Sequence, residues 1–136
     1  MSPHMNKYIK TPFFMFNSRF DAWQMDNDLQ VPCHVGEANH TKCSNAEQAA
    51  IVQYGADFID ALQPVVDSAP KNGAFITSCI CHSCNWTGLA LEGETSYAHY
   101  LNWFEGKTVP SIHVDDRPPN GAGVLDGGDY YCLPFP

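Results

Sequence analysis

The sequence predicts an α/β protein in which two parallel strands are joined through a helix. Two short apolar runs, at residues 13–16 and 74–80, have the length and composition of buried strands. Between these runs, apolar residues recur at helical spacing from about residue 45 to residue 65. A strand, a helix and a second strand in this order form a βαβ unit. With 136 residues, the chain is expected to contribute to a single domain.

The first strand is expected at residues 13–16, where the sequence FFMF is continuously apolar. Such a run is typical of a strand buried on both faces, as in a parallel sheet. Residues 17–21 are expected to form the loop that leaves this strand. Residues 22–43 contain Pro32 and Gly36 and are expected to be irregular.

The four residues Ser44-Asn45-Ala46-Glu47 predict where the helix begins. In such a capping box the Ser44 hydroxyl accepts a hydrogen bond from the first turn, while the Glu47 side chain reaches back to the cap. An apolar stripe follows, made up of Ile51, Tyr54, Phe58, Leu62 and Val65. The helix is therefore expected to run from about residue 45 to the region of Pro64.

The second strand is expected at residues 74–80, after a turn at residues 70–73, and a short helix at residues 97–105. Residues 107–136 are rich in Pro and Gly and are expected to form an irregular tail, with Asp115 and Asp116 in a solvated turn. Two apolar strands need covered faces and neighbouring strands, which we do not expect this chain to contain. The alternative is that the two strands pair with each other and expose an edge. We therefore expect residues 1–136 to be one segment of a domain that is incomplete on its own.

Composition excludes several kinds of partner. The net charge of −8 repels nucleic acid and anionic lipid, and no apolar run approaches the roughly 20 residues that span a membrane. Six cysteines, together with glycosylation sequons at Asn39 and Asn85, indicate a secreted protein. Because the first residues show no signal-peptide pattern, we expect the signal peptide to lie outside this chain and the chain to be a piece of a longer protein.

The cysteines have two interpretations, as disulfides or as metal ligands. They are Cys33, Cys43, Cys79, Cys81, Cys84 and Cys132. In an oxidising compartment they are expected to form disulfides, with Cys33–Cys43 as the first candidate pair and Cys79–Cys132 as the second. A thiolate–imidazole zinc cluster with His82 is a distant alternative, because structural zinc prefers two separated ligand pairs. We expect no metal.

Asp21 and His82 follow the two predicted strands, so parallel pairing would bring them to the same edge of the sheet. An Asp after one strand and a His after the next matches the order of these residues in a catalytic triad of the α/β-hydrolase type. Asp21 would hold His82 in one tautomer, and His82 would act as general base and then as general acid. The simpler interpretation of Asp21, favoured by its position alone, is that it caps the following turn.

The stretches that carry these two residues resemble the pectin acetylesterases and the related Notum-type carboxylesterases. IKTPFFMFNSRFDAWQ is similar to the family segment IKTPlFlvN-x-x-YDxWQ, and NGAFITSCICHSCNW is similar to NGmFInSC-x-x-HC. AHYLNWFEGK and the terminal YCLPFP are similar to the closing helix and the Cys-Pro-rich end of the family. The resemblance extends from about Lys10 to Pro136. It departs from the family pattern at Phe20, where the family has Tyr, and around Cys81, Ser83 and Cys84.

The resemblance implies that Asp21 and His82 belong to a Ser-His-Asp triad that hydrolyses O-acyl esters, here O-acetyl groups on a polysaccharide. No metal or organic cofactor is implied. None of the eight serines lies in a Gly-x-Ser-x-Gly elbow, so the nucleophile is expected in a missing N-terminal half and the chain alone is expected to be inactive. The alternative is a non-catalytic secreted module that binds carbohydrate or protein, and a zinc-binding module is a distant third.

Two tryptophans are further candidates for the substrate pocket. Trp23 follows Asp21 closely, where packing is its simpler role, and Trp86 lies near His82, where it either lines the pocket or sits on the surface beside a glycan on Asn85. The other histidines show no ligand spacing and are expected to be ordinary surface or helix residues. They include His34, His40, His99 and His113.

Overall fold

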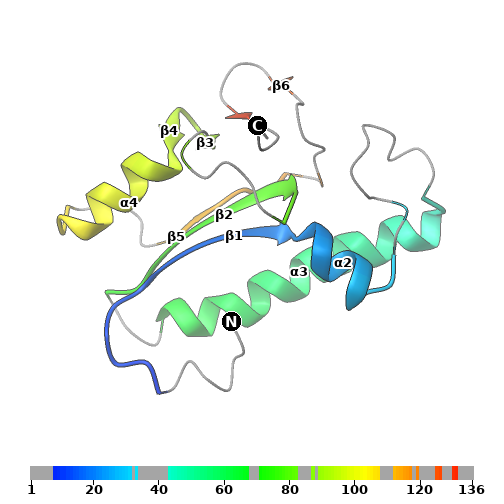
Figure 1. Ribbon diagram of the computed structural model, residues 1–136, viewed down its shortest axis with the longest axis horizontal. Helices are drawn as coiled ribbons and strands as arrows, with labels where there is room; N and C mark the ends of the chain where they lie inside the picture. Colours follow the sequence, from blue (N-terminus) through cyan, green and yellow to red (C-terminus); the bar gives the residue numbers. More distant parts are fainter. Residues whose placement is uncertain are drawn as a thin grey trace.

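A three-stranded parallel sheet with order β1-β2-β5 forms the centre of the protein in the computed structural model (Figure 1). The structure describes residues 8–31, 33, 43–67, 71–82, 87, 89–107, 112–117, 119, 125–126 and 130–131. Its central strand, β2 (Gly73–Ile80), is buried at every position. This confirms the expected second strand and its burial on both faces.

The first strand, β1 (Phe14–Phe20), pairs with β2 in parallel from Phe14 opposite Gly73 to Phe20 opposite Ile80. It therefore includes residues 17–20, where the sequence predicted a loop. The polar side chain of Ser18 is accommodated because its hydroxyl donates to the Cys79 carbonyl and accepts from the Phe20 N–H. Burial in β1 also differs from the expectation, since Phe14, Met15 and Phe16 are only partly buried on this edge strand.

The helices α2 (Ala22–Asn27) and α3 (Asn45–Asp67) follow β1. α2 lies in a region that was expected to be irregular. The capping box at the start of α3 is confirmed, because Ser44 N–H donates to Glu47 at 2.7 Å and Glu47 N–H donates to the Ser44 hydroxyl at 3.3 Å. α3 continues three residues beyond Pro64. This exposed proline has no N–H to donate to the preceding turn, so it removes one backbone hydrogen bond from the helix.

The segment after β2 contains a hairpin, a helix and a third strand of the sheet. The strands β3 (Ala90–Leu91) and β4 (Glu94–Thr95) lead into α4 (Ser96–Phe104), close to the predicted helix. β5 (Ile112–Val114) pairs in parallel with Ala74–Ile76 of β2, and β6 (Leu125–Asp126) pairs with β7 (Tyr130–Tyr131). The expectation of an irregular tail over residues 107–136 was therefore wrong for these strands. The expectation that the chain contains no neighbouring strand was also wrong, because β5 pairs with β2.

The two faces of the sheet have different cores. α3 covers one face, where Leu62 and Val66 pack against Ala74 and Ile76 of β2. α4 and the β3–β4 hairpin lie over the other face (Figure 1), where the core is rich in aromatic rings. None of the helices that the structure describes combines the length and hydropathy of a membrane-spanning segment.

We predict that Gly55→Val lowers the free energy of unfolding by about 2 kcal/mol, the usual effect of overpacking a core. A Cβ at Gly55 would lie 2.4 Å from Cε1 of the buried Phe20 ring. A side chain at this position would therefore push α3 and β1 apart or displace the Phe20 ring. The measurement is urea unfolding of the chain followed by circular dichroism. Ala61→Val, at an exposed position of α3, is the matched control and should cost about 0.5 kcal/mol. An equal loss in the two variants would contradict the close packing at Gly55.

Candidate active site

Asp21 and His82 come together at the end of the parallel sheet. Asp21 follows directly after β1, and His82 lies two residues after the end of β2. The Ala22 N–H donates to the Cys81 carbonyl at 3.3 Å, which extends the contact between the two chain segments beyond the strands. His82 Nδ1 lies 3.0 Å from each carboxylate oxygen of Asp21. Two residues that are 61 positions apart in the sequence thus share a hydrogen bond.

Asp21 also caps α2, so both interpretations of this residue hold in the structure. Its Oδ1 accepts a hydrogen bond from the Gln24 N–H at 2.9 Å, and the residue is 4% exposed. The Gln24 side chain is held in turn by Tyr54 of α3, whose hydroxyl donates to Gln24 Oε1 at 2.5 Å. Burial, together with the charges of Asp21 and Asp28, raises the pKa of Tyr54 to about 12. Tyr54 is therefore a neutral donor across the physiological pH range.

His82 is the accessible member of the pair, with 56% of its side chain exposed. When Nδ1 carries the proton that it donates to Asp21, Nε2 is left as the basic nitrogen of the ring. An exposed imidazole with a fixed tautomer can accept a proton from a hydroxyl group and return it later. The arrangement therefore has the geometry of a base and its orienting acid.

Of the two tryptophan candidates, Trp23 is the one that lies within the described residues. Its indole ring is 6.0 Å from the His82 ring, measured between centroids, and the residue is 51% exposed. Trp23 is therefore not a buried core residue, and it offers an open apolar surface beside His82. Trp86, the other candidate, lies outside the described residues, as do Asn39, Asn85, Cys84 and Cys132.

The described cysteines are in disulfides. Cys33 and Cys43 form the pair that was expected first, with an S–S distance of 2.06 Å. Cys79 and Cys81 are disulfide-bonded as well. These two sulfurs are thus not thiolates, and His82 Nδ1 faces Asp21. The interpretation of this segment as a thiolate–imidazole zinc cluster is wrong for these three residues.

Asp115 fixes the strand that leads to His82, a role that the sequence analysis missed. It is 5% exposed, so the expectation of a solvated turn was wrong for this residue. Its carboxylate accepts hydrogen bonds from the N–H and the hydroxyl of Ser78 in β2 and from the N–H and Nε of Arg117. The Asp115 carbonyl accepts from Arg19 Nη1 of β1 at 3.0 Å. The only local signal was the pairing of Asp115 with an arginine two residues later.

Comparisons with known proteins point to one family. The family model described as pectinacetylesterase matches residues 1–119. Pectin acetylesterase 7 of Arabidopsis thaliana is 29% identical over 117 residues, which cover 74% of this chain and 29% of that relative. Pectin acetylesterase 11 of the same plant is 32% identical over 98 residues, with 62% and 25% covered. The chain thus spans 25–29% of the length of these relatives. No solved structure matches the chain with significance.

We predict that Asp115 makes the stability of the chain pH-dependent. Although burial opposes it, the hydrogen bonds from Ser78 and Arg117 hold the pKa of Asp115 below its usual value. A depressed carboxyl pKa stabilises the fold above the unfolded-state pKa of about 3.9, and this stabilisation is lost as the pH falls below that value. Urea midpoints at pH 5 and pH 3 should therefore differ more in the wild type than in Asp115→Asn.

Asp115→Asn should also lower the free energy of unfolding at pH 7 by about 2 kcal/mol, because it removes charged hydrogen bonds. Asp60→Asn, at an exposed position of α3, is the control and should keep the pH dependence of the wild type. Equal losses between pH 5 and pH 3 in the wild type and in Asp115→Asn would contradict the prediction.

Proposed function

Because this chain belongs to the pectinacetylesterase family, we propose that it is part of a secreted carboxylic ester hydrolase that removes O-acetyl groups from a polysaccharide. In this proposal Asp21 and His82 are the acid and the base of a Ser-His-Asp triad. The observation that carries it is the contact of His82 Nδ1 with both Asp21 oxygens, each at 3.0 Å, at the ends of two neighbouring parallel strands.

The proposed reaction begins with removal of a proton. His82 Nε2 takes the proton of the nucleophilic serine as its oxygen attacks the acetyl carbonyl, and the imidazolium that forms is stabilised by Asp21. The tetrahedral intermediate collapses, the bond to the sugar oxygen breaks, and His82 returns the proton to that oxygen. Water then attacks the acetyl carbonyl and gives a proton to His82. The bond between the serine oxygen and the acetyl carbon breaks, His82 returns the proton to the serine oxygen, and acetic acid leaves and ionises to acetate.

The nucleophile and the oxyanion-hole donors are proposed to come from a segment other than this chain. The chain covers only a quarter to three-tenths of the relatives' length, which leaves room for such a segment in the whole protein. The exposure of the His82 side chain supports this view. A base that must reach a serine on another segment has to be accessible from outside its own segment. The reaction requires no metal or organic cofactor.

The substrate is proposed to lie against Trp23. Aromatic faces stack on sugar rings, and this indole is half exposed beside His82. The disulfide Cys33–Cys43 agrees with secretion, where such bonds persist. Asn39 and Asn85 remain the proposed glycosylation sites, and Trp86 remains a second proposed contact to the substrate.

We predict that His82→Ala and Asp21→Asn abolish most of the activity without unfolding the chain. The rate of 4-nitrophenyl acetate hydrolysis would be measured with this chain, with a nucleophile-bearing segment, and with the two joined in one polypeptide. Only the joined protein should be active. Asp21→Asn should lower its kcat about 10⁴-fold, because the His82 imidazole is then no longer held in the tautomer that leaves Nε2 free to accept a proton. Asp60→Asn is the control for the charge change and should keep full activity.

Two outcomes would contradict the triad. Equal activity of the joined wild-type protein and its His82→Ala variant would show that His82 is not the catalytic base. A joined protein that binds an acetylated polysaccharide but hydrolyses no ester would favour the alternative, a non-catalytic binding module.

We predict that Trp23→Ala affects the polysaccharide substrate more than the aryl ester. Loss of the stacking surface should raise KM for an acetylated polysaccharide about tenfold, while kcat for 4-nitrophenyl acetate changes less than about threefold. Trp23→Phe should restore most of the affinity, because it keeps an aromatic face. Equal effects on the two substrates would show that Trp23 supports the Asp21 loop and does not contact the sugar.

A further inference from the structure

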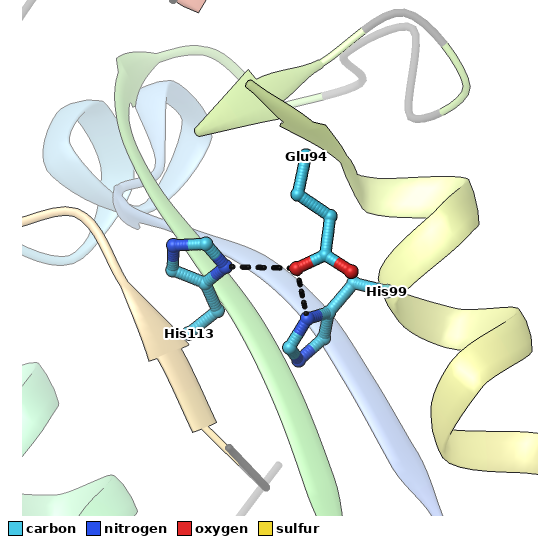
Figure 2. Close-up of side chains that lie close together, drawn as sticks. All are labelled: Glu94, His99 and His113. Carbon is cyan, nitrogen blue, oxygen red and sulfur yellow. Dashed lines mark hydrogen bonds and ion pairs between the residues drawn. The ribbon is translucent and has the colours of Figure 1, made fainter. Parts of the chain in front are cut away.

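Glu94, His99 and His113 form a second cluster of titratable side chains, on the α4 face of the sheet. They come from three elements, β4, α4 and β5. In Figure 2 the Glu94 carboxylate lies between the two imidazole rings. Glu94 Oε2 is 2.9 Å from His99 Nδ1 and 3.7 Å from His113 Nδ1. One potential ligand atom from each residue lies within 4.8 Å of the other two.

His99 is an unusual side chain to find in this place. It is 0% exposed and packs among the rings of Phe14, Phe75 and His113, at centroid distances of 5.7, 5.7 and 5.2 Å. Its Nε2 is buried and has no hydrogen-bond partner among the described residues. His99 does lie in a helix, as expected, but the expectation that it is an ordinary surface residue was wrong. A buried imidazole with one unpartnered nitrogen needs a strong interaction on its other side to offset its desolvation.

We propose that Glu94, His99 and His113 bind one divalent transition-metal ion, with Zn²⁺ as the preferred ion. Two imidazole nitrogens and one carboxylate oxygen are a recurring ligand set for zinc and its neighbours. Bonds of about 2.1 Å at tetrahedral angles place ligand atoms about 3.4 Å apart. The distances from Glu94 to the two histidines, 2.9 and 3.7 Å, lie on either side of this value. The third pair, made up of one nitrogen from each histidine, lies within 4.8 Å.

Burial and neighbouring side chains shift the pKa values of two members of the cluster. Burial lowers the pKa of His113, and the nearby His99 adds to this effect, while Glu92, Glu94 and Asp115 oppose it. The pKa of Glu94 is lowered although burial opposes this, because His99 and Asn102 donate hydrogen bonds to the carboxylate and His113 lies close to it. To bind a metal ion, His99 Nδ1 must lose the proton that it donates to Glu94 Oε2 at 2.9 Å, so metal binding at this site should release a proton.

A neighbouring residue holds the carboxylate in position. Asn102 Nδ2, one turn of α4 beyond His99, donates to Glu94 Oε1 at 3.1 Å. This hydrogen bond leaves Oε2 directed at both histidines. Such supporting hydrogen bonds around a metal ligand fix its orientation and contribute to affinity.

The proposed ion would have an open coordination position and a structural role. Three protein ligands leave a fourth position for water. Of the three proposed ligands, His113 lines an open pocket of about 330 Å³, together with Glu92 and Asp115, and in this proposal the water enters from that side. Because its ligands belong to β4, α4 and β5, the ion would link the hairpin and α4 to the edge of the sheet.

This site is separate from the Asp21–His82 pair. Phe75 contacts the rings of both His99 and His113, and His82 lies seven residues further along the same segment. At about 3.3 Å per strand residue, the two sites are roughly 20 Å apart. Failure of one proposal therefore leaves the other unaffected.

The test is metal binding by the full chain after removal of metal with EDTA. Zn²⁺ titration by calorimetry should show one site with a Kd of about 1 μM or tighter, and Co²⁺ should give the intense visible absorption of a low-coordinate site. His113→Gln and Glu94→Gln should weaken Zn²⁺ binding at least 100-fold. His82→Ala is the matched control, since it removes a histidine from the other site, and should bind Zn²⁺ like the wild type.

A second measurement covers the case in which a variant does not fold. Zn²⁺ should raise the Tm of the wild type, and in ¹⁵N-histidine NMR spectra it should shift the ring nitrogens of His99 and His113. Absence of one-site binding in the wild type would overturn the proposal, as would unchanged binding in a folded His113→Gln variant. Zinc-induced shifts confined to histidines other than His99 and His113 would also overturn it.

Discussion

The parallel pairing of β1 with β2 is the constraint on which the rest of the structure depends. Hydrogen bonds between the strands place Phe20 opposite Ile80, so the two chain segments leave the sheet at the same edge. Asp21 and His82 then lie close together without any local interaction in the sequence. The same pairing gives α3 one face of β2 to cover and leaves the other face to α4. The hydrogen-bonded pairing of β1 with β2 thus also determines the geometry of the candidate active site.

The sequence predicted the elements whose signals are local. The capping box at Ser44 and Glu47 marked the start of α3, and the apolar composition of residues 74–80 marked β2. β5 could not be predicted in this way, because a three-residue strand that contains His113 is stabilised by its pairing with β2 and not by its own composition. The length of β1 was missed for a related reason. The hydroxyl of Ser18 in this strand is satisfied by the Cys79 carbonyl, 61 residues away.

The same distinction applies to the side chains of the two sites. Asp21 and His82 could be paired from the sequence, since each follows a strand and parallel strands bring such positions together. Glu94, His99 and His113 could not, because they converge from a hairpin, a helix and an edge strand with no regular spacing. Asp115 likewise reads as a polar turn residue until β5 is placed beside β2, where its carboxylate meets the backbone of Ser78. Side chains that meet only through packing between elements could therefore not be predicted from local patterns in the sequence.

The strand ends, and not the number of residues between them, determine the distance from Asp21 to His82. The intervening chain includes α3, and the hydrogen bonds described for its residues do not involve the imidazole of His82. Insertions or deletions in the connections on either side of α3 can therefore accumulate while the acid and the ring keep their contact. A search for related chains that fixes this spacing would reject proteins with the same arrangement, whereas one that fixes the two strand-terminal motifs would retain them.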